Sequence, residues 1–316
     1  MSIPSATYIH ASIRGRWNVA VRRLVFIAAM CSAVSWACTI PVFRFALDRW
    51  PADGLKLVMP SSAAKDRDLS LALLPYRGNG AANLKIEEAD QPAGTESRLY
   101  LSNDDRREKP IWHGTLTPSE LGALVDSPKR QELLKRLLDG ESVVWVVVDG
   151  GGDKDSAEAE RVSKRLHYLE KVVELPPQDP DDPDSQLGPG PALKLKLTSM
   201  RISARDDKEK LFCAMLAGAK CADVLAKGQA FAAAVFGRGR VLGSFPLSEL
   251  DDTALEDISM FLTGRCSCRV KNQSPGWDVL LKVDWDSALQ KAQEGRKREV
   301  PARSEPEVVR ILPKKE

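Results

Sequence analysis

The sequence lacks the short motifs that mark common enzyme active sites. It has no GxSxG, which presents a nucleophilic serine, and no HExxH, which holds a zinc ion. The glycine run Gly150–Gly152 is followed by no GK[ST] and is surrounded by aspartates, so a solvated turn is favoured over a phosphate-binding loop. The three histidines, His10, His113 and His167, stand far apart and form no metal-ligand pattern. These absences favour a non-catalytic protein, and no resident cofactor or metal is predicted.

The sequence also has little net charge, +2 over 316 residues. Residues 1–37 hold four arginines and no acidic residue, so the remainder carries −2. A nucleic-acid-binding protein needs a basic face that displaces counterions from phosphates, so nucleic acid is not predicted as a partner. With 43% apolar and 28% charged residues, the composition is that of an ordinary globular protein, and the length suits two domains.

The first 37 residues have the pattern of an export signal. The apolar run Leu24–Ala37 has about fourteen residues, whereas a membrane-spanning helix needs about 20. Two arginines precede the run, and Ser35–Ala37 ends it with small residues in the first and third places, as in a signal peptide cleaved after Ala37. We therefore expect residues 1–37 to be a signal peptide and the mature protein to lie in the periplasm or cell envelope.

Cleavage after Ala37 would make Cys38 the first mature residue. Bacterial lipoproteins are acylated on a cysteine in this place, although Ser35 and Trp36 depart from the usual lipobox. Lipidation of Cys38 and simple cleavage both stay open. A lipid on Cys38 is the one membrane attachment that the sequence suggests for the mature chain.

The apolar pattern of the remainder predicts a mixed α/β protein. Val143–Val148 reads VVWVVV, which indicates a strand covered on both faces and hence the centre of a largely parallel sheet. Helices are expected near 128–138 and 156–175, the first with proline in its first turn and glycine after its end. Residues 176–192 are rich in proline and aspartate and are expected to be a disordered insertion, and residues 288–316 a loose charged tail.

An internal repeat refines this prediction. HGTLTPSEL at 113–121 aligns with LGSFPLSEL at 242–250, and each leads toward a helix that ends in a similar pattern, LLDG or FLTG. Similar strands and helices precede both segments. We therefore predict a thioredoxin-like α/β unit over 141–287, with strand, helix, strand, helix, hairpin and helix in order. Residues 38–140 are expected to form a shortened copy that lacks the middle helix.

Three strings carry a resemblance to a known family. CTIPVFRFALDRWPAD after the leader, FGRGR in the expected hairpin, and CSC…PGWDVLL near the end resemble an uncharacterised family of exported bacterial proteins with a thioredoxin-like middle. The resemblance implies export and this fold. It implies no particular activity.

A thioredoxin-like fold would carry a redox pair between its first strand and first helix, where a helix N-terminus lowers thiol pKa values. The two corresponding loops, Asp149–Lys154 and Ser61–Ala64, contain no cysteine. Ordinary thioredoxin catalysis is therefore not predicted.

Five cysteines follow the leader, and an odd number in an oxidising compartment leaves at least one unpaired. Cys213 lies in an apolar helical stretch and is expected in the core, with Cys221 as an alternative disulfide partner. Cys266 and Cys268 would point to the same face of an extended segment.

Three interpretations of the Cys266/Cys268 pair stay open. The favoured one is structural: one member bonds Cys38, so that all three cysteines lie close together. The others are a strained, easily reduced Cys266–Cys268 disulfide and a soft-metal site for an ion such as Cu(I). The expected function is accordingly a binding or scaffolding role at the cell envelope. The alternative is a thiol-disulfide oxidoreductase or a soft-metal handling protein that uses Cys266 and Cys268.

Overall fold

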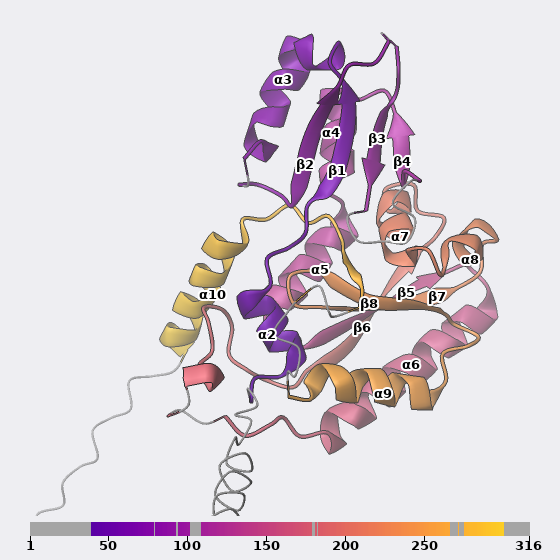
Figure 1. Cartoon of the computed structure of the whole chain (residues 1–316). Helices are drawn as coiled ribbons and strands as arrows, with labels where there is room; N and C mark the ends of the chain where they lie inside the picture. The colour runs from indigo at the N-terminus through magenta and orange to yellow at the C-terminus, as the bar shows by residue number, and fades with distance from the viewer. Residues whose placement is uncertain are drawn as a thin grey trace, which may run out of the picture. The chain divides into compact units, whose positions relative to one another are not determined.

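The computed structural model describes residues 39–78, 80–92, 94–101, 109–178, 181, 183–265, 271 and 275–299 (Figure 1). This part of the chain is a mixed α/β structure with two mixed sheets. The expected mixed α/β class is therefore confirmed. Among the described residues no helix is long and apolar enough to cross a membrane.

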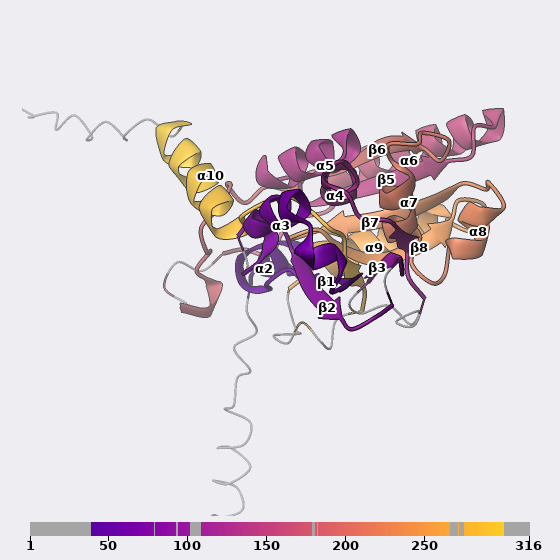
Figure 2. The same cartoon turned by 90° about the horizontal axis from the view of Figure 1, so that it is seen from above.

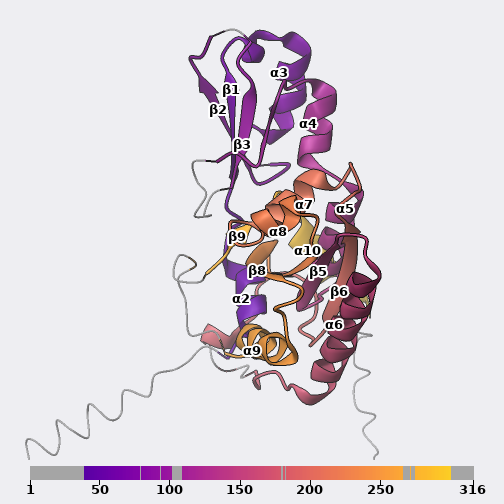
Figure 3. The same cartoon turned by 90° about the vertical axis from the view of Figure 1, so that its right-hand side faces the viewer.

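The first sheet has the strand order β2-β1-β3-β4. Its strands are β1 Leu55–Pro60, β2 Leu84–Ala89, β3 Ser97–Tyr100 and β4 Trp112–Gly114. β1 runs parallel to β2 and antiparallel to β3, and β3 runs antiparallel to β4. The helix α3 (Arg67–Leu73) links β1 to β2, and it contacts α4 (Pro118–Val125) on one side of the sheet (Figure 3).

The second sheet has the order β6-β5-β7-β8-β9. Its strands are β5 Val143–Asp149, β6 Leu197–Ser203, β7 Phe231–Phe236, β8 Arg240–Pro246 and β9 Trp277–Asp278. β5 is central and Val143 to Val148 are fully buried, as the valine run predicts. The sheet is not largely parallel, however, because only β5 and β6 pair in parallel. A continuous apolar run indicates that a strand is covered on both faces, but it does not determine whether the neighbouring strands run parallel or antiparallel to it.

Helices cover both faces of the second sheet. They are α5 Pro128–Leu138, α6 Asp153–Val172, α7 Lys210–Ala217, α8 Ala222–Ala226 and α9 Asp252–Thr263. α6 and α9 contact each other on one face, and α5 and α7 lie on the other (Figures 1 and 3). Asp251 accepts a hydrogen bond from the Ala254 amide at 2.8 Å and so caps α9.

The two sheets share one connectivity. In each, a first strand, a helix and a parallel second strand precede an antiparallel hairpin and a closing helix. Between the second and third strands, the second sheet has α7 and α8, whereas the described residues of the first sheet have no helix there. The helix match within the repeat fails, because residues 118–138 form two helices, α4 and α5, separated at Asp126–Ser127 where Pro128 starts α5.

The boundary expected at residue 140 separates two sheets but not two cores. Thr39 onward forms one compact unit, and one continuous core contains Leu57 and Leu99 of the first sheet together with Val146 of the second. The first helix of the described residues, α2 (Val42–Arg49), contacts β7 and α9 although it precedes the first sheet in the sequence. The described residues before β1, which include α2, therefore pack with the second sheet and its helices.

The described residues of 176–192, which are 176–178, 181 and 183–192, are not the disordered insertion that their composition predicts, and residues 179, 180 and 182 lie outside the described residues. The buried Arg44 guanidinium of α2 donates to Pro191 O at 2.5 Å and Gly188 O at 3.1 Å. Asp48 pairs with Arg44 at 2.8 Å and accepts from the Gly188 amide at 2.8 Å. Burial raises the pKa of Asp48, although Arg44 and this amide favour its carboxylate. Buried partners for the loop backbone hold this stretch in place despite its prolines.

The expected loose tail also differs in part. Residues 285–299 form α10 (Trp285–Glu299), which buries Leu289 and contacts α5 (Figure 2). The strand expected before it is short, because only Trp277 and Asp278 pair with β8. Trp285 and Leu289 complete the shared core, and Asp286, Lys291 and Glu294 are exposed.

Candidate groove at the carboxyl end of β5

One cavity lies where β5, β6 and β8 end and β7 begins. It is an open groove of about 1010 Å³, and we call it the β5 groove. Its wall contains the loop after β5 and the loop before β7, and its apolar floor includes Val224, Ala230 and Leu247. In α/β sheets, ligands bind beyond the carboxyl ends of strands, at the point where connections leave to either side. β5 has that position here.

The glycines after β5 are required by close contacts. A Cβ atom on Gly150 would lie 2.0 Å from the carbonyl oxygen of Gly228, so only glycine allows the two loops to approach. Gly151 has φ +88°, and a Cβ there would lie 2.9 Å from the guanidinium carbon of Arg205. The run is therefore a packed part of the groove and not merely a solvated turn.

Two amides of this loop are already bonded. The Asp155 carboxylate accepts from the Gly150 amide at 2.9 Å and from the Gly152 amide at 3.4 Å. An incoming phosphate would have to displace a carboxylate from the same donors, which supports the sequence argument against a phosphate-binding loop.

The other carboxylates that line the groove, Glu158, Asp251 and Asp252, are held in caps and ion pairs. Arg161 donates to Glu158 at 2.8 Å and to Asp252 at 2.5 Å, and it also bonds the Leu250 carbonyl. Asp251 caps α9. A general base must be free to accept a substrate proton, so these carboxylates favour structure over proton transfer.

The two described cysteines are buried free thiols. Cys213 and Cys221 form no disulfide with each other, so the alternative pairing is wrong. Burial, with Glu209 and Asp206 nearby, raises the pKa of Cys213 to about 12. Burial also raises the pKa of Cys221. Since the thiolate is the reactive form, neither is a redox centre at neutral pH.

The cysteines singled out by sequence, Cys38, Cys266 and Cys268, lie outside the described residues. Described residues beside them do meet. Pro41 and Arg265 form an antiparallel bridge, and the Val42 amide donates to Gly264 O at 3.1 Å.

The remaining predicted features are structural. Gly237 and Gly239 have positive φ in the hairpin between β7 and β8, as FGRGR predicts. His113 is exposed and bonds Glu96 at 2.8 Å, and His167 is exposed on α6. Among the described residues, no group of three or more His, Cys, Asp or Glu side chains could hold a metal ion.

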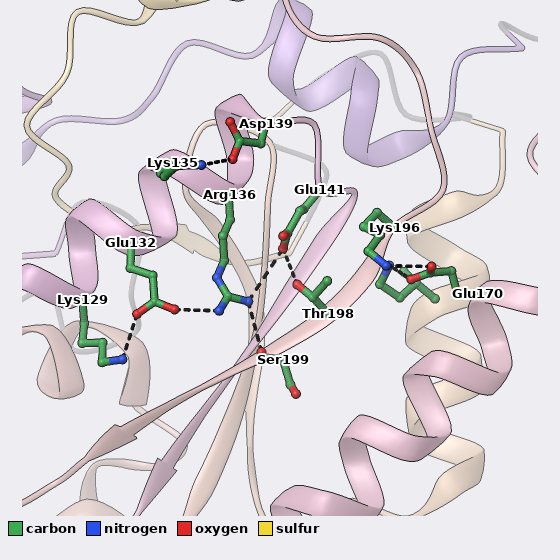
Figure 4. A network of polar contacts seen from close by, with 11 residues as sticks. Lys129, Glu132, Lys135, Arg136, Asp139, Glu141, Glu170, Lys196, Thr198 and Ser199 are labelled. Carbon is green, nitrogen blue, oxygen red and sulfur yellow. Dashed lines mark hydrogen bonds and ion pairs between the residues drawn. The ribbon is translucent and has the colours of Figure 1, made fainter.

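A polar network joins α5 to the edge strand β6 (Figure 4). Arg136 donates to the Ser199 carbonyl at 3.1 Å and pairs with Glu132 at 2.6 Å, while Thr198 donates to Glu141. These contacts satisfy the outer edge of β6, so we assign them to stability.

Comparison of the chain with protein-family models, with curated proteins and with solved structures gives no significant match. The β5 groove was only partly foreseeable from sequence. The glycine run after a buried strand marked its first wall. Gly228 and the loop after β8 also line the groove, but only the order of the strands brings them there. No local sequence motif marks them.

Proposed function

We propose that this chain is an exported protein of the cell envelope with a non-catalytic binding or scaffolding role, and that the β5 groove is its binding site. The observation that carries the proposal is the loop Gly150–Gly152. It lies at the carboxyl end of the central strand, where its glycines admit a close approach of Gly228 and its amides are capped by Asp155. The groove is lined in part by apolar residues, of which Val224 is partly exposed and Ala230 and Leu247 are buried, and the four carboxylates of its wall are held in caps and ion pairs.

We also propose that the second sheet with α6, α7 and α9 is a thioredoxin-like unit, and that the first sheet is its shortened copy. The shared strand order and the shared place of the hairpin support this proposal. In such a unit the β5 groove would occupy the place of the redox pair. Glycines at that place suit binding and cannot exchange disulfides.

The competing function is a thiol-disulfide oxidoreductase that uses Cys266 and Cys268. An insulin-reduction assay on the full chain separates the two. We expect no reduction above background for the native protein, for Cys266→Ser/Cys268→Ser, or for the control Ser267→Ala, which keeps both thiols. Activity that persists in Ser267→Ala and disappears in the double variant would replace the binding role with the redox role.

Export is tested separately. Intact mass and N-terminal sequencing of the protein from its native host should show a chain that begins at Cys38, with or without a lipid. A cytosolic form that begins at Met1 or Ser2 would contradict export, whatever the insulin assay shows.

A further inference from the structure

The charged side chains that line the β5 groove differ in whether they have partners. The lining holds four carboxylates and three cationic side chains. Each carboxylate is bonded within the wall, by loop amides, by Arg161 or by the first turn of α9. Of the three cations only Arg161 is engaged, because within the described part of the chain Lys154 and Arg205 have no ion pair and no side-chain hydrogen bond. The acceptors of the groove are therefore in use, and two cationic donors are available.

The first available cation, Arg205, is held against the loop after β5. The carbon and both terminal nitrogens of its guanidinium lie 2.9, 3.1 and 3.2 Å from the point that a Cβ atom on Gly151 would occupy. The guanidinium therefore covers the α-carbon of Gly151, and only glycine leaves room for it. The loop that carries Arg205 is also fixed, because the Ala204 amide donates to Asp149 O, at the end of β5, at 2.9 Å. These contacts place a cation at one point of the groove wall.

The second available cation, Lys154, lies at the start of α6. It shares the helix face that lines the groove with Glu158 and Arg161, four and seven residues later. A lysine at this spacing could pair with Glu158, but Glu158 bonds Arg161 at 2.8 Å instead. Arg161 also pairs with Asp252 across the groove wall, at 2.5 Å. Arg161 thus engages two of the carboxylates of the lining and leaves the Lys154 ammonium without one.

We propose that the β5 groove takes a ligand with a carboxylate group on an apolar body. The inference rests on the proposed binding function and names the ligand class of that site. The carboxylate would compensate the charge of Arg205, whose planar fork matches two carboxylate oxygens, and Lys154 favours the same sign of charge. The apolar body would lie on Ala157, Val224 and Pro246, which line the groove and are at least partly exposed.

Other classes of ligand fit these groups less well. A cationic ligand needs a carboxylate that is free, and the four that line the groove are engaged. A phosphate would use the backbone amides after β5, of which Asp155 already bonds two. A neutral apolar ligand would take water from two cations and give them no counter-charge. A carboxylate uses the donors that the side chains offer.

Three probes with one apolar body and different head groups test the proposal. They are 4-phenylbutyrate, 4-phenylbutyramide and 4-phenylbutylamine. Calorimetry on the full chain measures the binding constants, and amide chemical shifts locate the binding. We expect the acid to bind about tenfold more tightly than the amide, because the amide has no charge to share with the guanidinium. The amine should bind most weakly.

Substitution of each cation shows whether it causes this preference. Arg205→Gln should lower the binding constant of 4-phenylbutyrate about tenfold and leave that of 4-phenylbutyramide unchanged, so that the two probes bind alike. Lys154→Gln should lower the binding constant of the acid about threefold, and added salt should reduce this effect. The matched control is Arg98→Gln on β3, which removes another exposed arginine that has no ion pair with a described residue. It should bind all three probes as the native protein does.

The same chemistry can come from a small organic acid or from the end of a peptide chain. A fourth probe, N-acetylleucylphenylalanine with a free carboxylate, separates the two sources. Tighter binding than 4-phenylbutyrate would assign the groove to the end of a peptide chain, and weaker binding would assign it to a small acid. Either order supports the proposal, provided that Arg205→Gln weakens the binding of both acids.

The proposal is overturned by equal binding of 4-phenylbutyrate and 4-phenylbutyramide, by equal losses in Arg205→Gln and Arg98→Gln, or by the absence of binding. The proposed binding function fails on different evidence. If the amides of 150–152 and 228–230 shift alike with the acid and the amide, the groove binds ligands without using a carboxylate, and the binding function stands. Reduction of insulin through Cys266 and Cys268 would replace that function, whichever probe binds.

Discussion

The two sheets have the same connectivity but differ in how many of their faces are covered. β5 in the second sheet is buried on both faces, whereas β1 in the first alternates, with Lys56 exposed and Val58 partly so. The second sheet has α7 between its second and third strands, and the described part of the first sheet has no helix at that place. The sequences of the two strands show this difference: β5 contains VVWVVV and β1 reads LKLVMP. A strand with one open face alternates apolar with polar residues, whereas a strand covered on both faces is apolar throughout. β5 is covered by α6 on one face and by α5 on the other, while α7 covers β7 and β8.

The strongest test of this comparison places the same charge on both first strands. Val146→Asp should abolish folding, because a carboxylate without a partner in a fully buried site costs more than most of the roughly 5–15 kcal/mol that stabilises a domain. Val58→Asp should cost about 1 kcal/mol, since its carboxylate reaches water and lies opposite Arg98 on β3. Urea unfolding followed by circular dichroism measures both. Similar losses for the two variants would show that the open face of β1 is covered by something else.

Sequence patterns predicted elements better than they predicted how those elements meet. The valine run and the helical stripe of α6 were visible because each needs only its own residues. Two features were not visible, for a common reason. The loop around Gly188 is held through its backbone by Arg44, and Gly150 is needed because Gly228 approaches it. In both cases the partner is a backbone carbonyl that is distant in sequence. Because every residue type has the same carbonyl, no residue pattern in the sequence marks such a partner.

The second prediction concerns the N-terminal segment, which packs with the second sheet although it precedes the first. Pro41 bridges to Arg265, so Cys38 and the Cys266/Cys268 pair are each within three residues of paired backbone. We expect non-reducing peptide mapping to find Cys38 bonded to one of the two. Loop entropy over more than two hundred residues assigns such a bond about 5 kcal/mol, less any strain, so Cys38→Ala should lower the unfolding free energy by up to this amount.

The control for this disulfide is Cys221→Ala, which removes a buried thiol that is free. Cys221→Ala keeps the predicted disulfide, so its unfolding free energy should fall on reduction by the same amount as that of the native protein, whereas that of Cys38→Ala should not change. A mapped Cys266–Cys268 bond with an acylated Cys38 would contradict the prediction and favour the redox or lipoprotein interpretation.

The third prediction concerns the contacts of Arg130 and Glu209 between α4, α5 and α7. We call these contacts the joint between the two sheets. Arg130 of α5 is buried and donates to Leu124 O at 2.8 Å and Ala123 O at 2.9 Å, at the end of α4. Glu209, beside α7, accepts from Ser127 at 2.7 Å and from the Lys129 amide at 2.8 Å. Burial lowers the pKa of Arg130 to about 10, so the side chain stays charged at neutral pH.

Arg130→Met should therefore cost about 3 kcal/mol, because it leaves two helix-end carbonyls and a buried carboxylate without their cation. Arg136→Met, on the same helix but in the partly exposed network of Figure 4, should cost about 1 kcal/mol or less. Denaturant unfolding measures both. If Arg130→Met also splits the transition in two, the two sheets unfold separately once the joint is lost. Equal costs for the two variants would show that the joint does not depend on Arg130.

The smallest effect is expected on the open face of the first sheet. There, a cation lies as far from an aromatic ring as in a second, buried pair, so the two pairs differ in burial and not in distance. The Lys56 ammonium lies 5.8 Å from the ring centre of Tyr100, and the Arg240 guanidinium lies 5.8 Å from that of Trp50. Lys56 also pairs with Glu87 at 3.4 Å, with both side chains about half exposed, whereas Arg240 pairs with the buried Asp278 at 3.1 Å. Water and salt screen the first set of contacts and hardly reach the second.

Lys56→Met should therefore change the unfolding free energy by less than about 0.5 kcal/mol, and this change should vanish in high salt. Arg240→Met should cost about 2 kcal/mol at any salt concentration, because the buried Asp278 then keeps Lys271, at 2.5 Å, but loses the buried guanidinium of Arg240. A large, salt-independent cost for Lys56→Met would mean that the face of the first sheet is closed in solution, and the contrast between the two sheets would then be wrong.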